Sequence, residues 1–216
     1  MSVPAIPITI LTGFLGAGKS TLLQKWLEEL PREETAVIVN ERGDVGVDGE
    51  LLAGRVARLR ELTGGCVCCK NQAELASALG ELSEAEPRPS RIFVETSGAA
   101  SPAGVIQAIV TPGVRERLFL DGVVTVLDVL RAERALGFDV AVEQLGFADV
   151  VVLSHIDEAS AAPVEVDAVL ELVSRHAPAA VIARASQGSL PLSFVDLMAQ
   201  RADTLHLWPE GTAHSS

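Results

Sequence analysis

The 216-residue chain contains no tyrosine, and aromatic residues make up only 4% of it. Hydrophobic residues nevertheless account for 48%, so a folded core has to be built almost entirely from aliphatic side chains. Such a composition is typical of a parallel sheet that is covered by helices on both faces. The length is that of one large α/β domain, which is enough to bury a substantial core.

Cysteine is also scarce, and its placement excludes one class of protein. The only three cysteines are Cys66, Cys68 and Cys69, which lie within four consecutive positions. Residues so close in sequence cannot form a framework of long-range disulfides. The cysteines therefore indicate a local site rather than covalent stabilisation of the fold.

Basic residues are few relative to acidic ones. The chain has 17 Lys and Arg against 29 Asp and Glu, a formal net charge of −12. Nucleic acid and anionic membranes are bound by clustered positive charge, so we expect neither as a partner. No apolar run approaches the length of a membrane span, and no basic stretch precedes the first apolar run. We expect a cytoplasmic protein.

A glycine-rich motif is the most informative part of the chain. Residues 13–20 read Gly-Phe-Leu-Gly-Ala-Gly-Lys-Ser, between an apolar run at 6–11 and an amphipathic pattern at 21–27. This is the G-x-x-x-x-G-K-[ST] phosphate loop in its expected context of strand, turn and helix. Its N–H groups and the helix N-terminus cradle phosphate, while Lys19 reaches the β- and γ-phosphates and Ser20 ligates magnesium. The motif predicts binding of a nucleoside triphosphate.

Apolar runs alternate with helical patterns along the rest of the chain, which predicts right-handed crossovers and a parallel sheet. We therefore expect an α/β, three-layer P-loop NTPase fold with a mostly parallel central sheet flanked by helices. Residues 1–203 are predicted to form one domain, followed by a flexible tail at 204–216. The expected strands are 6–11, 35–40, 56–62, 91–95, 122–127, 150–154 and 181–185, and the expected helices are 21–30, 72–82, 103–109, 140–147 and 165–175.

Carboxylates near strand ends are candidates for the catalytic site. Glu95 ends an apolar strand and is followed by Thr-Ser-Gly, so it should face the same crevice as Lys19. There it could hold magnesium, while the N–H of Gly98 could meet a γ-phosphate; an exposed glutamate without function is the alternative. Glu41, after the second strand, is a further candidate for holding magnesium or positioning water, and Asp48 is a weaker one.

The segment Cys66-Val67-Cys68-Cys69 is the second candidate site. Thiolates suit Zn²⁺, Cu(I) and similar ions. Three cysteines supply three of four tetrahedral positions, and the fourth would come from water, a carboxylate, a histidine or another protein. That arrangement suits a site that passes metal on. Buried apolar cysteines and a redox pair are the alternatives.

Together these segments carry a family resemblance. The chain resembles the CobW-like family of metallochaperone GTPases, relatives of the GTPases that mature urease and hydrogenase, over residues 6–192. The segments that carry it are GFLGAGKSTLL, NERGDVGVDGELL, ELTGGCVCC, VETSGAASP and FADVVVLSHIDE. The Cys-x-Cys-Cys motif is the specific part, because the phosphate loop alone marks only a superclass.

The resemblance implies a slow GTPase that uses Mg²⁺ and GTP, and whose nucleotide state gates the transfer of Zn²⁺ or Co²⁺ to a client metalloprotein. By the resemblance, Cys66, Cys68 and Cys69 bind this metal, Glu95 belongs to the magnesium site with Ser20, and Glu41 lies in the switch. GTP and GDP are the expected ligands, and a nucleotide- or metal-dependent homodimer is possible. The residues expected at the nucleotide are Gly13, Leu15, Gly16, Ala17, Gly18, Lys19, Ser20, Thr21, Gly98, Ser154, His155, Asp157 and Ala185.

The chain departs from the family pattern in three places. Where the family has Asn-Lys-x-Asp for guanine, residues 154–157 read Ser-His-Ile-Asp, so we expect a guanine preference at reduced affinity through Asp157. Arg42 replaces a common Phe; it could act as an arginine finger, although an exposed loop arginine is the simpler interpretation. Family members usually carry a C-terminal domain, which the residues after about 203 are too few to form; we expect either a short member of the family or a truncated chain.

Two other functions fit parts of the sequence. A metal sensor or buffer would use nucleotide only as a conformational ligand and would show no multiple turnover. A small-molecule kinase would use the same phosphate loop but would leave the cysteines unexplained. For a GTPase we expect weak basal turnover, because residues 95–98 contain no glutamine to orient the attacking water.

Overall fold

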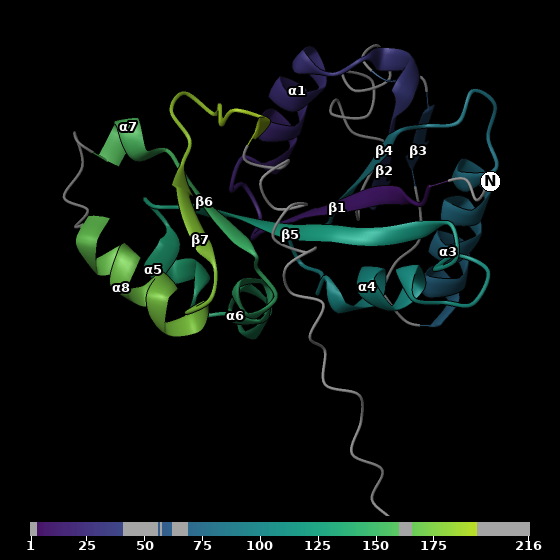
Figure 1. Cartoon of the computed structure of the whole chain (residues 1–216). Helices are drawn as coiled ribbons and strands as arrows, with labels where there is room; N and C mark the ends of the chain where they lie inside the picture. Colours follow the sequence, from purple (N-terminus) through teal and green to yellow (C-terminus); the bar gives the residue numbers. More distant parts are fainter. Residues whose placement is uncertain (1–3, 41–55, 57, 62–68, 160–165, 194–216) are drawn as a thin grey trace, which may run out of the picture.

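The computed structural model describes residues 4–40, 56, 58–61, 69–159 and 166–193 (Figure 1). Its described strands form one seven-stranded sheet in the order β3-β2-β4-β1-β5-β6-β7, with every pairing parallel. The expected parallel architecture is confirmed. The strands are β1 (Ile6–Thr12), β2 (Thr35–Asn40), β3 (Arg58–Glu61), β4 (Arg91–Thr96), β5 (Leu118–Asp128), β6 (Val150–Ser154) and β7 (Val181–Arg184).

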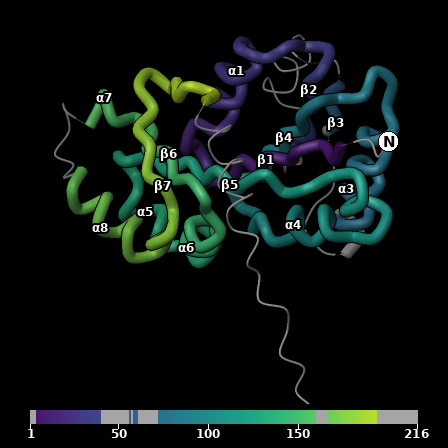
Figure 2. The backbone as a smooth tube through the Cα atoms, viewed as in Figure 1, coloured from purple at the N-terminus to yellow at the C-terminus, as the bar shows by residue number. Residues whose placement is uncertain are grey.

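Helices cover both faces of the sheet and complete three layers. Helix α1 lies on one face, whereas α3, α4, α6 and α8 lie on the other (Figures 1 and 2). No helix in the described ranges has both the length and the apolar character needed to cross a membrane. The helices are α1 (Lys19–Glu29), η1 (Arg32–Glu34), α3 (Cys69–Ser83), α4 (Ala103–Ile109), α5 (Ala132–Ala135), α6 (Asp139–Gly146), α7 (Ile156–Ala159) and α8 (Val166–His176).

Strand β1 is the centre of the sheet. It pairs with β4 on one side and with β5 on the other, and Ile8, Ile10 and Leu11 have no exposed surface. A strand buried on both faces explains the continuous apolar run at 6–11, since neither face has to be polar. Because all the strands are parallel, their carboxyl ends meet at one edge of the sheet, and ligands bind at that edge in open α/β folds.

The largest fully buried side chain is Trp26 on α1. Its ring lies 5.9 Å from the ring of Phe93 on β4, and its Nε1 donates a hydrogen bond of 2.9 Å to the carbonyl of Leu190. The indole thus links α1, the sheet and the chain that follows β7. A buried indole N–H needs such a partner, because an unpaired one is costly.

The predicted and observed elements differ mainly at their ends. The strand expected at 56–62 spans Arg58–Glu61, and the helix expected at 72–82 begins earlier, at Cys69. The short helices α5 and α7 were not predicted. Each has only four residues, which is too short for the 3.6-residue periodicity to be visible in the sequence.

Replacing the buried indole gives a test of this packing. We expect Trp26→Phe to lower the free energy of unfolding by about 2–4 kcal/mol, because the carbonyl of Leu190 loses its donor and a cavity remains. Urea denaturation followed by circular dichroism measures this change. Phe119→Leu, at a side chain that is 41% exposed, is the control and should cost less than about 1 kcal/mol. Equal losses in the two variants would contradict the proposed role of Trp26.

Candidate nucleotide-binding site

The phosphate loop connects β1 to α1 at the carboxyl edge of the sheet. Gly13, Gly16 and Gly18 all have positive φ, a conformation that glycine adopts without strain. At Gly13 a side chain is also excluded by space, because an added Cβ would lie 2.2 Å from the carbonyl oxygen of Val126. The first glycine is thus needed to let the loop leave β1 beside β5.

Lys19 begins helix α1 and is largely buried, with 8% of its surface exposed. Its Nζ donates hydrogen bonds to the carbonyls of Gly13 at 3.0 Å and Phe14 at 3.5 Å. The ammonium group of Lys19 therefore lies inside the phosphate loop, although Lys19 itself is the first residue of helix α1. The charge is already at the place where phosphate oxygens would enter, so little side-chain entropy remains to be lost on binding.

Ser20 and Glu95, the two residues expected at the magnesium site, lie in contact with each other. The Ser20 hydroxyl on α1 donates a 2.8 Å hydrogen bond to Oε1 of Glu95, which is only 4% exposed at the end of β4. Next to Glu95, the Thr96 hydroxyl donates to that of Thr12 at 2.8 Å and ties the ends of β4 and β1 together. A hydroxyl beside a carboxylate is an oxygen donor set of the kind that Mg²⁺ takes, so the residues present fit that ion.

The turn after β4 lies directly against the phosphate loop. A Cβ added to Gly98 would lie 2.6 Å from the backbone nitrogen of Leu15 and 2.8 Å from its Cα. Only glycine permits this approach. The structure thus places Gly98 and Leu15, both expected at the nucleotide, in contact with each other.

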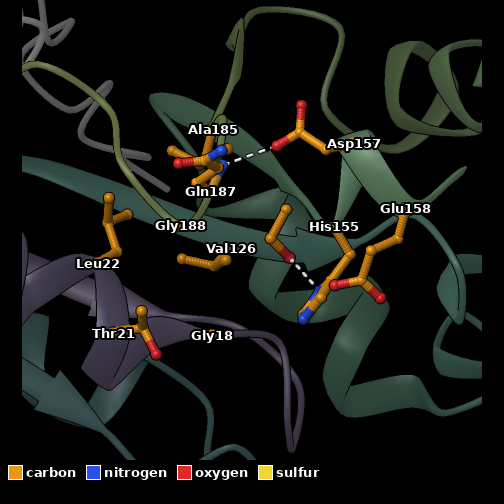
Figure 3. A pocket seen from close by; sticks show the side chains of 12 residues that line it. Gly18, Thr21, Leu22, Val126, His155, Asp157, Glu158, Ala185, Gln187 and Gly188 are labelled. Atoms are coloured by element: carbon orange, nitrogen blue, oxygen red, sulfur yellow. Dashed lines mark hydrogen bonds between the residues drawn. The ribbon is translucent and has the colours of Figure 1, made fainter. Parts of the chain in front are cut away.

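A cavity of about 220 Å³ opens beside the start of α1, at the ends of β5, β6 and β7 (Figure 3). Asp157 lies at one side of it, where its Oδ2 accepts a hydrogen bond of 2.7 Å from the backbone N–H of Gln187. The hydroxyl of Ser186 also donates to Asp157 Oδ2, at 3.2 Å. These two contacts join Asp157 to the loop after β7. Six of the residues that were predicted at the nucleotide line the cavity, namely Gly18, Thr21, Ser154, His155, Asp157 and Ala185.

Ser154 and His155 connect this cavity to the phosphate loop. The Ser154 hydroxyl donates a 2.7 Å hydrogen bond to the carbonyl of Ala17. His155 has a φ of 55°, and its Nδ1 lies 3.2 Å from Oγ of Ser154 and 3.4 Å from Oδ1 of Asp128. The short serine thus reaches the loop directly, and the imidazole is held between Ser154 and the carboxylate of Asp128.

Sequence reasoning missed six of the twelve residues that line the cavity, namely Leu22, Val126, Val152, Glu158, Gln187 and Gly188. Gln187, with a φ of 48°, and Gly188, with a φ of 72°, form the tight loop after β7 that lines the cavity. A Cβ on Gly188 would lie 2.9 Å from Cγ2 of Thr21, so glycine lets this loop approach α1. The Gln-Gly pair reads only as a turn in the sequence, because nothing local indicates which helix it meets.

A second cavity, of about 320 Å³, lies on the other side of the phosphate loop. The rings of Phe14 and Phe138 stack there with centroids 5.0 Å apart. Arg131 lies beside Gly16, because a Cβ added to Gly16 would be 3.1 Å from Nη1 of Arg131. Nε of Arg131 is 3.7 Å from Oδ2 of Asp128. Sequence reasoning missed this cation near the phosphate loop, since Arg131 belongs to no motif.

Several predicted residues lie outside the described part of the chain. Glu41, Arg42 and Asp48 belong to residues 41–55, and Cys66 and Cys68 belong to residues 62–68. Cys69 is the first residue of α3, but its side chain is not described. Within the described ranges no group of three or more His, Cys, Asp or Glu residues could hold a metal ion. The cysteine site therefore stays a prediction from sequence.

Comparison with known proteins relates the chain to a named family. The profile of the CobW/HypB/UreG nucleotide-binding domain matches residues 7–184. The zinc chaperone YjiA of Escherichia coli is 39% identical over 163 residues, which are 73% of this chain and 51% of that protein. The zinc chaperone CobW of Pseudomonas aeruginosa is 35% identical over 221 residues, covering 87% of this chain and 58% of that protein. The chain thus spans about half the length of these curated relatives.

Solved structures show the same fold. The Zn(II)-bound YjiA GTPase of E. coli superposes with a TM-score of 0.69 at 26% identity, over 91% of this chain and 63% of that one. HypB of Helicobacter pylori, solved in complex with nickel, superposes with a TM-score of 0.61 at 17% identity, over 98% of this chain and 92% of that one. At that lower identity the likeness to HypB concerns the fold alone. The expected P-loop GTPase fold is confirmed.

The position of Asp157 predicts which base the cavity prefers. A carboxylate accepts the N1–H and N2–H of guanine, which adenine lacks, so we expect GTP to bind at least about tenfold more tightly than ATP. Asp157→Asn replaces one acceptor by a donor that suits the 2-oxo group of xanthine. We therefore expect this variant to lose its preference for GTP and to gain affinity for XTP in calorimetric titrations.

The matched control for this titration is Asp167→Asn, at an exposed acid in the first turn of α8. It should leave the order of affinities unchanged. Wild-type protein that bound ATP as tightly as GTP would contradict the assignment of Asp157.

Proposed function

This chain belongs to the CobW/HypB/UreG family of nucleotide-binding domains, and we propose that it is a slow GTPase that binds a transition metal and passes it to a client protein. The observation that carries the nucleotide half of this proposal is the hydrogen bond between Ser20 and Glu95 beside Lys19. The hydroxyl and the carboxylate meet at the carboxyl edge of a parallel sheet, next in the chain to Lys19, and ligands bind at that edge.

The proposed chemistry is attack of water on the γ-phosphate in line with the leaving oxygen. Lys19 and the N–H groups of the phosphate loop would stabilise the charge that develops on the phosphate oxygens. Ser20 and Glu95 would hold Mg²⁺, which neutralises part of that charge. The expectation of slow basal turnover rests on the sequence, because residues 95–98 contain no glutamine to orient the attacking water.

The metal half of the proposal rests on the cysteines and on the relatives. The matched relatives from E. coli and P. aeruginosa are named zinc chaperones, and the YjiA structure is described as Zn(II)-bound. We propose zinc as the first candidate for the metal of Cys66, Cys68 and Cys69, with cobalt as the alternative. Three thiolates suit Zn²⁺ and leave one tetrahedral position for an exchanging ligand.

The described neighbours of the cysteine segment support a link to the nucleotide. Val39 on β2 pairs with Glu61 on β3 and with Glu95 on β4. Glu61 is thus two strand spacings from Glu95, or about 10 Å. Helix α3 then begins at Cys69, eight residues after Glu61. We propose that bound metal and γ-phosphate bias one another through this short stretch of chain.

Turnover tests the first half of the proposal. We expect wild-type protein with Mg²⁺ and GTP to release phosphate over many turnovers, and Lys19→Ala to reduce the rate at least about 100-fold through loss of charge stabilisation. Lys25→Ala, at a half-exposed lysine on the same helix, is the control and should keep the wild-type rate. Tight GTP binding by wild type without multiple turnover would instead indicate a nucleotide-responsive metal sensor or buffer.

Metal titration tests the second half. We expect anaerobic wild-type protein to bind one Zn²⁺ or Co²⁺ per chain with thiolate charge-transfer absorption, and GTP to change its affinity. The triple variant Cys66→Ser, Cys68→Ser, Cys69→Ser should lose this absorption. It should also lose any effect of metal on GTP turnover while keeping GTP affinity in metal-free buffer. Identical turnover and nucleotide affinity of the variant and of metal-saturated wild type would contradict the coupling.

A further inference from the structure

Gln144 is a buried polar side chain that the proposed chemistry does not use. It lies on helix α6 and is only 1% exposed. Its Nε2 donates hydrogen bonds to two backbone carbonyls of the turn after β4, at 2.9 Å to Ala100 and at 3.3 Å to Gly98. One buried amide thus holds two successive points of a turn that is 44 to 46 residues away in sequence.

The helix that carries this amide is itself fixed to the sheet. The hydroxyl of Thr125 on β5 donates a 2.8 Å hydrogen bond to the backbone carbonyl of Gln144. A second link joins the same helix to the turn at the surface, where the Ser101 hydroxyl donates to Oε1 of Glu143 at 2.7 Å. The amide of Gln144 therefore spans from a rigid element to the turn.

The two polar atoms of the Gln144 amide differ in their partners. Its Oε1 is buried, and no residue in the described ranges donates a hydrogen bond to it. Its Nε2, by contrast, is the buried donor to the carbonyls of Gly98 and Ala100, and an apolar side chain of the same size would leave these two carbonyls without that donor. The contribution of the amide to the fold is therefore made through Nε2 and through the turn that Nε2 holds.

The turn held by Gln144 is the one that lies against the phosphate loop. Gly98 packs so closely on Leu15 that a Cβ would lie 2.6 Å from the Leu15 nitrogen. The proposed γ-phosphate contact is the N–H of Gly98, whereas the β-phosphate is held by residues 13–20. A displacement of the turn would thus affect the contact that only a triphosphate makes.

We propose that Gln144 is a positioning residue that fixes the Gly98 turn for the terminal phosphate and so sets how strongly the site prefers GTP to GDP. The proposal rests on the proposed function, because it assumes that GTP occupies the phosphate loop. It adds that discrimination between triphosphate and diphosphate depends on a side chain of helix α6, on the far side of the turn from the nucleotide.

Gln144→Met tests this proposal, since methionine fills a similar volume but has no donor. Calorimetric titration of the full chain with Mg²⁺ would compare GDP, GTP and a non-hydrolysable GTP analogue. We expect affinity for GTP and its analogue to fall about tenfold, and affinity for GDP to change less than about twofold. Turnover should fall with the affinity for GTP.

Thr125→Val is the matched control. It removes the buried hydrogen bond to the backbone of Gln144 but keeps the side-chain amide, and helix α6 stays packed on the sheet through the buried Leu145. We expect this variant to lower thermal stability and to leave the ratio of GTP to GDP affinity unchanged. If Gln144→Met lowered GTP and GDP affinities equally, or if Thr125→Val changed the ratio as much, the positioning role would be overturned.

A second variant, Gln144→Asn, keeps the proposal testable if Gln144→Met folds poorly. Gln144→Asn keeps a buried amide but is one methylene shorter, so it cannot hold both carbonyls, and the affinity ratio should again fall. An unchanged ratio in this variant would overturn the proposal. Absence of any nucleotide binding by wild-type protein would count against the proposed function instead, so the two failures are distinguishable.

Discussion

The parallel pairing of β1 with β4 and β5 is the constraint on which every proposed nucleotide contact depends. In this register Leu11 lies opposite Glu95 and also opposite Val124, and Thr12 lies opposite Thr125. Side chains alternate between faces along a strand, so a slip of one residue would turn Glu95 to the other face and away from Ser20. The buried hydrogen bond between Thr96 and Thr12 stabilises this register at the carboxyl edge of the sheet, where the proposed nucleotide contacts lie.

Residues 154–157, where the resemblance leads us to expect the guanine motif, contact the phosphate loop. Ser154 lies opposite Asp128 in the pairing of β6 with β5, and its hydroxyl reaches the carbonyl of Ala17. His155 takes an uncommon positive φ and turns its imidazole toward Asp128. The cavity and the phosphate loop are thus joined by a buried hydroxyl. Asp157 lies beside the same cavity.

The sequence was informative wherever the signal was local. The phosphate loop and the apolar run of β1 are each contained in a few residues, and the meeting of Glu95 with Ser20 followed from the rule for parallel strand ends. Gln144 could not be found in this way, because its partners are carbonyls 44 to 46 residues distant, and backbone carbonyls carry no sequence signature. Arg131 was missed for a similar reason, since its place beside Gly16 depends on how the segment after β5 folds.

Two elements that converge on the phosphate loop give the proposed coupling a physical basis. Gln144 reaches the Gly98 turn from α6, while β2, between β3 and β4, joins the strand that precedes the cysteines to the strand that carries Glu95. A close-packed interior transmits strain because it is hardly compressible, so metal bound at the proposed cysteine site would act on Glu95 through the paired strands β3, β2 and β4. In that proposed site three thiolates would leave one tetrahedral position to an exchanging ligand, and a displacement of the cysteines would change which ligand completes the tetrahedron.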